Sequence, residues 1–339
     1  MAARTPDLRS EQGMALLITI MTVALLVAVT LQYHKTTWDK YLASRNYMSG
    51  TQLTAIAESG INIAMAVLQE DDREADSLHD GWAMLEKEPF RELFSTGTLK
   101  IKIEDLSGRF PINNIAARAG SGGQGGVNAV TAGKNREILT KLLSSGAFPK
   151  VEDETMAKQI VDAVTDWIDE NDEESDFGAE NGYYQSLAKP YSCKNKPLEY
   201  IEELLLVRGM TPALLFGSGE NPGLADFLTV HAAQDGNINL NTAPLLLIQC
   251  LMDPPVDDQM IQDLGEYRKA KEKEEELKTP SWYRNVAGWS DITLQNITTK
   301  STFFQVTSTG TLETLSRRIV ASVERADPDE VNLLGRRME

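Results

Sequence analysis

Carboxylates are concentrated between Asp166 and Glu180, a segment with eight of them and no basic residue. Such crowding favours a bound cation, and hard oxygen ligands suit Ca²⁺, which takes roughly 6 to 8 of them in flexible geometry. Asp166, Asp169 and Asp172 would share a face if the preceding helix continued, and a turn at residues 176–178 would return Glu180 toward them. The alternative is a solvated acidic loop that binds no ion. An EF-hand is excluded, because no glycine occupies the sixth loop position.

The overall composition limits the other chemistry that is available. The formal charge of −17 argues against nucleic acid as a partner, because binding to phosphates depends on Lys and Arg. The cysteines, Cys193 and Cys250, allow one disulfide bridge in an oxidising compartment, or two small buried thiols. At 339 residues, the chain is long enough for more than one compact unit.

The N-terminal region must span or anchor to a membrane. Residues 14–31 contain no charge, and a helix through Tyr33 would be about 30 Å long, which matches a hydrocarbon core. The three threonines in this run can bond to the helix backbone. A cleavable secretory signal peptide is the alternative, but its apolar region is shorter, whereas this one continues into further helix.

The junction Ser10-Glu11-Gln12-Gly13-Met14 resembles the processing site of type IV pilin-like proteins. In that family a prepilin peptidase cuts after the glycine, the new N-terminus is usually methylated, and the globular part faces the periplasm. The resemblance makes Gly13 the last leader residue and Met14 the mature N-terminus. Ile18 stands at the fifth mature position, where major pilins carry a glutamate, and this implies a place at the end of a filament.

Beyond the membrane segment, the pattern predicts an α+β fold. Apolar residues at helical spacing between Leu53 and Leu68 predict that the same helix continues and packs on a domain. Alternation at residues 98–103 predicts a strand, as do residues 302–307 and 318–324, with a turn around Gly310 joining the last two. The stretch between the first strand and these two reads as mostly helical.

A further set of motifs follows in order along the chain. The motifs are Glu104-Asp105-Leu106-Ser107-Gly108-Arg109, Ile112-Asn113-Asn114, Asp166-Trp167-Ile168-Asp169, Gly178-Ala179-Glu180, Tyr183-Tyr184, Pro190-Tyr191, Lys194-Asn195, Pro197-Leu198, Glu202 to Val207, and Asn237 to Pro244. Together they resemble the K-type minor pseudopilins of the type II (general) secretion pathway.

The resemblance implies a pilin-like antiparallel sheet that packs on the long transmembrane helix and is interrupted by a large helical insertion with sterile-alpha-motif-like folds. The implied division is a cleaved leader (1–13), a transmembrane helix (14–33), a first pilin-like part (34–118), the insertion (119–285, as units 119–222 and 223–285), the C-terminal strands (286–326) and a flexible tail (327–339).

The resemblance also implies structural calcium, a location and partners. The expected calcium ligands are Asp166, Asp169, Asp172, Asp176, Glu180 and Asn195. The chain would be a single-pass protein of the inner membrane with its bulk in the periplasm, and it would cap the tip of the pseudopilus. Its partners would be the I-type and J-type minor pseudopilins, the pseudopilus shaft subunits and the prepilin peptidase.

Two other functions were weighed against this structural, non-enzymatic role. A membrane-anchored periplasmic hydrolase has little support, because His34, His79 and His231 are scattered and the sequence contains no HExxH or G-x-S-x-G motif. A calcium sensor would need a bistable element that the ion biases, and a structural ion needs none.

Overall fold

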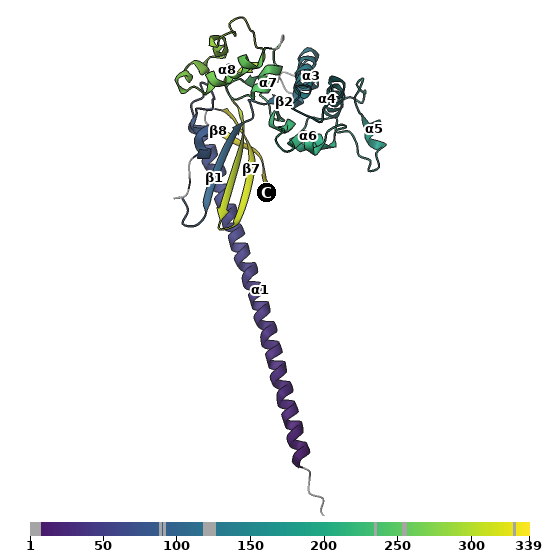
Figure 1. Cartoon of the computed structure of the whole chain (residues 1–339), viewed down its shortest axis with the longest axis vertical. Coiled ribbons are helices and arrows are strands. Elements are labelled where there is room, and N and C mark those ends of the chain that lie inside the picture. Colours follow the sequence, from purple (N-terminus) through teal and green to yellow (C-terminus); the bar gives the residue numbers. More distant parts are fainter. Residues whose placement is uncertain are drawn as a thin grey trace, which may run out of the picture.

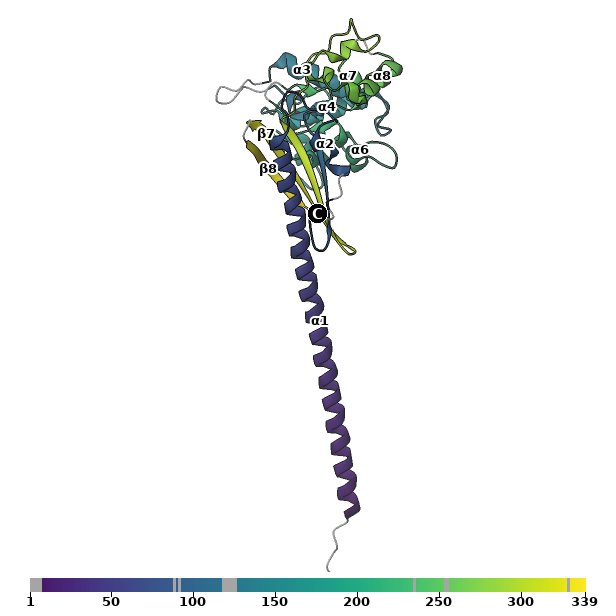
Figure 2. The same cartoon turned by 90° about the vertical axis from the view of Figure 1, so that its left-hand side faces the viewer.

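The fold is known from a computed structural model that describes residues 8–87, 90, 93–117, 127–233, 236–252, 256–327 and 330–339. Its largest element is α1 (Leu8–Glu70), a continuous helix of 63 residues. Figures 1 and 2 show that its N-terminal half extends away from the rest of the protein. Residues 1–7 of the predicted leader lie outside the described residues, whereas Gly13 and Met14 are exposed on α1.

The two halves of α1 have different surroundings. The apolar residues from Met14 to Leu31 are exposed, and α1 is the one described helix that is long and apolar enough to cross a membrane. The hydroxyls of Thr19, Thr22 and Thr30 donate to carbonyls three or four residues earlier, which confirms the predicted bonding to the helix backbone.

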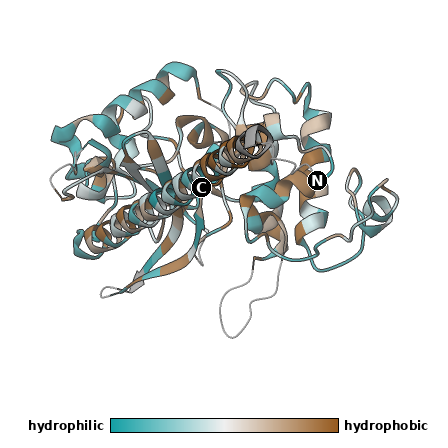
Figure 3. Ribbon diagram, turned by 90° about the horizontal axis from the view of Figure 1, so that it is seen from below, coloured by the Kyte–Doolittle hydropathy of each residue, from teal (hydrophilic) through white to brown (hydrophobic). Residues whose placement is uncertain are grey.

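The C-terminal half of α1 covers one face of an antiparallel sheet. The predicted apolar stripe is confirmed at Leu53, Ile56, Ile61 and Leu68, which are all buried. Of these, Ile56, Ile61 and Leu68 belong to one hydrophobic core, together with Trp82, Ile101, Phe304, Val306, Ile319 and Val323. Seen from below in Figure 3, apolar residues recur along the length of α1.

The sheet has four strands in the order β1-β6-β7-β8, namely β1 (Thr98–Asp105), β6 (Phe303–Leu312), β7 (Leu315–Asp327) and β8 (Glu330–Met338). This confirms the α+β class and the three predicted strands. The predicted flexible tail is wrong, because residues 330–338 pair with β7 in antiparallel register. The arginines and glycine of β8 hid its strand pattern from sequence analysis.

The turn between β6 and β7 also differs from the prediction. It lies at residues 313–314, where Glu313 has a φ of 53°, and Gly310 is inside β6. Gly310 serves close packing, because a Cβ atom there would lie 3.0 Å from the carbonyl oxygen of Leu53 and from Cγ2 of Ile56. Only glycine lets α1 approach the sheet so closely.

Short elements flank the sheet and build the helical insertion. Beside β1 lie α2 (Gly81–Met84) and the 3-10 helix η1 (Leu85–Lys87). The insertion contains α3 (Ala129–Leu143), α4 (Glu154–Ile168), α5 (Asn181–Gln185), α6 (Pro212–Phe216), α7 (Leu245–Cys250) and α8 (Asp258–Lys269). Its 3-10 helices are η2 (Ile112–Ile115), η3 (Ile201–Leu206), η4 (Leu224–Asp226), η5 (Lys271–Lys273), η6 (Glu276–Lys278) and η7 (Trp282–Asn285). Two parallel strand pairs complete it, β2 (Phe110–Pro111) with β3 (Leu228–Thr229) and β4 (Ile238–Asn239) with β5 (Ile297–Thr298).

The insertion is wider than the predicted range of 119–285. Phe110 and Ile115 on one side, and Trp289 and Leu294 on the other, are buried in the same hydrophobic core as its helices. This core also runs through both predicted units without interruption. The glycine-rich residues 118–126, at the predicted boundary, lie outside the described residues.

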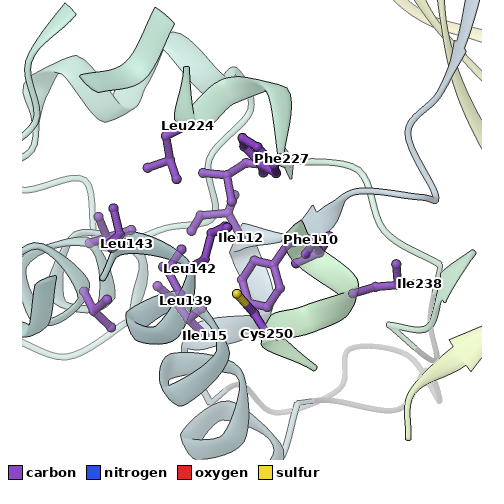
Figure 4. Close-up of a cluster of buried hydrophobic side chains, with 14 of the residues drawn as sticks. Phe110, Ile112, Ile115, Leu139, Leu142, Leu143, Leu224, Phe227, Ile238 and Cys250 are labelled. Atoms are coloured by element: carbon purple, nitrogen blue, oxygen red, sulfur yellow. The ribbon is translucent and has the colours of Figure 1, made fainter. Parts of the chain in front are cut away.

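The cysteines do not form the disulfide bridge that the sequence allowed. Cys193 and Cys250 are free, buried thiols. Figure 4 shows Cys250 beside Phe110 in the core of the insertion, whereas Cys193 Sγ lies 3.6 Å from the carbonyl oxygen of Asp166. Burial raises the pKa of Cys193 to about 12 and that of Cys250 to about 11, as expected for unreactive packed thiols.

Candidate metal site and the junction between sheet and insertion

The acidic segment begins at the C-terminus of α4 and continues as a loop. Helix α4 is capped at its N-terminus by Asp153, which accepts from Met156 N, and it ends at Ile168. Asp166, Asp169 and Asp172 therefore do not share one continuous helix face. Residues 169–180 are called the acidic loop below.

Asp166 organises the start of the acidic loop from within. Its side chain is 0% exposed and accepts from Ser175 Oγ at 2.6 Å and from Ser175 N. A Cβ atom at Gly178 would lie 1.8 Å from Asp166 Oδ2, so this position requires glycine. The loop is therefore folded around the Asp166 carboxylate.

Aromatic side chains hold the end of α4 against α5. The rings of Trp167 and Tyr184 have centroids 5.0 Å apart at an angle of 77°, and those of Tyr184 and Tyr191 are 5.3 Å apart. Arg208 lies over the ring of Tyr183 at 5.2 Å. These contacts fix the position of Glu180, which caps the N-terminus of α5 by accepting from Asn181 N.

Two buried oxygen atoms near the acidic loop have no hydrogen-bond donor. Glu180 is 5% exposed and its Oε1 lacks a partner, as does Oδ1 of Asn195. The amide nitrogen of Asn195 donates to Asn171 O at 3.0 Å and to Asp172 Oδ1 at 2.9 Å. A buried acceptor without a partner is costly, so these atoms fit an oxygen-binding cation such as Ca²⁺.

Electrostatics identify the same group of residues. Burial, and then the charges of Asp166, Asp169 and Asp172, raise the pKa of Glu180 to about 7. Burial and the charge of Asp166 raise the pKa of Asp169 to about 6. Among the predicted ligands, Asn195 contacts Asp172, and the charges of Asp166, Asp169 and Asp172 act on Glu180. Among the described residues, no three of these carboxylates have oxygen atoms within 4.8 Å of one another. Asp176 is exposed and lies instead near Asp162, whose pKa its charge helps to raise.

A second acidic group, which sequence analysis missed, lies between the sheet and the insertion. Carboxylate oxygens of Asp71, Asp76 and Asp80 lie within 4.8 Å of one another and could bind a metal ion. The guanidinium of Arg325 already lies among them, with Nη1 3.1 Å from Asp71 Oδ2 and Nη2 bonded to Asp76 Oδ1. Its side chain is 2% exposed and lies over the ring of Phe304.

Asp105 at the end of β1 extends this network. Its buried carboxylate accepts from Ser107 N, Thr242 Oγ1, Ser301 Oγ and Asn239 Nδ2. Asn239 Nδ2 also lies 3.0 Å from the carbonyl oxygen of Asp76. Two motifs that are distant in sequence, Glu104 to Arg109 and Asn237 to Pro244, therefore meet here. The side chains of Asp76, Asp105, Asn239, Ser301 and Arg325 are called the junction below.

The histidines do not form a catalytic group. His79 Nε2 lies 3.0 Å from the carbonyl oxygen of Arg268, and His231 stacks on Phe303. Burial lowers the pKa of His231, and His34 is exposed on α1. The three histidines therefore lie in different surroundings and do not come together in one group.

Comparisons with known proteins agree with this arrangement. The family model "Type II secretion system (T2SS), protein K" matches residues 108–216. The type II secretion system protein K of Pseudomonas aeruginosa is 25% identical over 76% of this chain and 73% of its own. That of Aeromonas hydrophila is 26% identical over 70% of this chain and 69% of its own.

A solved structure shares the fold. It is the GspK-GspI-GspJ complex of the enterotoxigenic Escherichia coli type 2 secretion system, with a TM-score of 0.66 and 17% identity over 87% of this chain and 99% of that chain. An apolar N-terminal helix on an antiparallel sheet, with a helical insertion, is the arrangement of a pseudopilin, a structural secretion component. The chain is similar to the type II secretion system protein K family.

Proposed function

We propose that this protein is a single-pass inner-membrane protein whose sheet and insertion lie in the periplasm, where it caps the pseudopilus. Helix α1 is the observation that carries the proposal. One half is apolar and exposed, as a lipid-embedded or filament-packed segment must be, and the other half is the core of a pilin-like domain. The helical insertion, with its sterile-alpha-motif-like units, would then form the outermost part of the tip.

Cleavage after Gly13 is the decisive test of this topology. Gly13→Val is expected to block leader removal and methylation of Met14 and to abolish secretion. A Cβ atom at Gly13 meets nothing within 4 Å, so the substitution leaves the fold intact. Gly50→Val is a matched control on the same helix, also with nothing within 4 Å. Normal secretion by an uncleaved Gly13→Val protein, established by mass spectrometry, would contradict the proposal.

The partners follow from the relatives. The related solved complex contains GspI and GspJ, and corresponding I-type and J-type subunits are proposed to bind this chain beside the shaft subunits.

Ile18 leaves the membrane segment without the carboxylate of major pilins. This suits a subunit at the tip, which has no further subunit above it. Ile18→Glu should let the chain enter the shaft, where crosslinking to shaft subunits would detect it. A crosslinking pattern unchanged by this substitution would count against the tip position.

Structural calcium in the acidic loop is the second part of the proposal. Support comes from the unpartnered oxygens of Glu180 and Asn195 and from the crowded carboxylates. Calorimetry on the full chain in detergent, after chelation, should detect saturable calcium binding. The double variant Asp169→Ala, Asp172→Ala should lose it, and Asp258→Ala, Asp263→Ala, with two exposed aspartates on α8, should keep it. Absence of binding would remove calcium and leave the anchored-subunit proposal standing.

A further inference from the structure

The two edges of the sheet are protected to different extents. At one edge, β1 carries Lys100 and Lys102 and is packed against α2 and η1. At the other, β8 pairs only with β7 in the described sheet, and its nine residues include neither lysine nor proline. Natural sheets usually cover or charge their edges, because a free edge can pair with another chain. The edge at β8 is open in this respect.

The pairing of β7 with β8 shows which backbone groups face the open edge. Arg318 and Glu339 exchange both of their backbone N–H···O bonds, at 3.2 and 2.9 Å. In an antiparallel ladder such pairs alternate with pairs that are not hydrogen-bonded. The N–H and C=O groups of Met338 and Arg336 therefore point away from β7, where a fifth strand could bond to them.

A cleft of about 450 Å³ lies beside this edge, between the sheet and the insertion. Leu334 and Val320 line it from the sheet, and Tyr200 and Ile201 line it from the insertion. Leu334 is 42% exposed and Tyr200 is 63% exposed, so both present apolar surface to an incoming chain. In Figure 1 the C-terminus, just after β8, lies below α6 on the side of the sheet that faces the insertion.

The lining of the cleft has a small excess of positive charge, in a chain of net charge −17. It includes Arg109, Arg336 and Arg337 and the acidic residues Glu199 and Glu202. Arg109 pairs with Glu104, and Arg336 pairs with Glu58 on α1, so Arg337 is the arginine that faces across the cleft. The Arg337–Glu202 ion pair crosses the cleft, and both side chains are partly exposed. Such a pair contributes about 0 to 1 kcal/mol, so a carboxylate from a ligand can replace Glu202.

We propose that β8 and this cleft bind an extended segment of a partner protein, which adds to the sheet as a fifth strand. Backbone bonds to Arg336 and Met338 would supply affinity. An apolar side chain between Leu334 and Tyr200, and an acidic one at Arg337, would supply specificity. This inference concerns a surface other than α1 and the acidic loop, so it stands or falls separately from the proposed function.

Full-length protein in detergent would be titrated with a fluorescent nine-residue peptide of alternating valine and glutamate, acetylated and amidated at its ends. Saturable binding is expected by anisotropy. The double variant Arg336→Glu, Arg337→Glu should bind about tenfold more weakly. The variant Lys35→Glu, Arg45→Glu makes the same change of charge at exposed positions of α1 and should bind as the original protein does. Failure of the original protein to bind would overturn the proposal.

Two further probes separate strand addition from other effects. A valine–lysine peptide should bind Arg336→Glu, Arg337→Glu better than it binds the original protein, a gain that misfolding cannot produce. A valine–glutamate peptide with every second backbone nitrogen methylated should not bind, and equal binding would mean attraction by charge alone. Light scattering tests for a second copy at the edge, since dimers abolished by the double variant would show self-pairing and refute a partner segment.

Discussion

The junction places the guanidinium of Arg325 between Asp71 and Asp76, whereas the acidic loop gathers Asp169 and Glu180 with no ion pair to either among the described residues. Burial raises the pKa of Asp76 to about 7, although Arg325 lowers it. The pKa of Glu180 reaches the same value with like charges adding to burial. One region therefore has its cation built into the chain, and the other is the one for which we propose a cation taken from solution.

The largest effect is expected from removing the built-in cation. Arg325→Met leaves Asp76 buried beside an apolar group and should lower the free energy of unfolding by about 3 to 5 kcal/mol. Urea denaturation of the full chain in detergent measures this loss. Arg318→Met is the control on the same strand, because Arg318 is 56% exposed and its ion pair with Glu339 is at the surface. If both variants lost less than about 1 kcal/mol, the junction would not depend on its arginine.

Removal of calcium should give the next largest effect. An ion present at about 100 times its dissociation constant stabilises the folded state by about 2.7 kcal/mol. EDTA should therefore lower the melting temperature of the original protein by several degrees without changing its circular dichroism at 20 °C. Arg318→Met should respond equally to EDTA, whereas Asp169→Ala, Asp172→Ala should already melt low and not respond. An identical melting curve with and without EDTA would contradict an ordered ion.

Crowding at Gly178 should have a smaller effect that is confined to the acidic loop. Gly178→Ala forces a Cβ atom toward Asp166 Oδ2 and should cost about 1 to 3 kcal/mol, as overpacking usually does. Calcium affinity should fall with it, since Asp166 holds the loop. Gly182→Ala is the matched control in α5, where a Cβ atom meets nothing within 4 Å. Unchanged stability and affinity in Gly178→Ala would show that the loop can shift without cost.

The acidic loop could be anticipated from sequence because its carboxylates are close together in the chain. The α1 stripe and strands β1, β6 and β7 were also readable, since Leu53, Ile56 and the alternating residues of β1 follow helical and strand periods. The junction was not readable in this way. Asp76 and Arg325 are separated by 249 residues and meet only through the sheet. The boundary of the insertion was missed for the same reason, because Phe110 and Leu294 join its core only in three dimensions.

The smallest predicted effect uses pH to compare the two regions. Because the pKa of Glu180 in the folded protein is about 7, above its ordinary value of 4.5, the native state holds this proton more tightly than the unfolded state does. Its contribution to stability is present below pH 4.5 and is lost as the pH rises toward 7, by on the order of 1 kcal/mol. Glu180→Gln should therefore melt with less dependence on pH than the original protein in EDTA.

Calcium should separate the two regions, because the ion neutralises Glu180 and Asp169 but does not reach Asp76. Over pH 4.5 to 7, saturating calcium should lower the pH dependence of the original protein further than Glu180→Gln does in EDTA, because the substitution leaves Asp169, whose pKa is about 6, free to titrate. The part that remains arises from Asp76 and Asp71, whose pKa values burial raises to about 7 and about 6, and both give a loss of stability in the same direction as the pH rises. If saturating calcium abolished the entire pH dependence of stability, calcium would also bind at the junction. The charge of Arg325 alone would then not neutralise the carboxylates there.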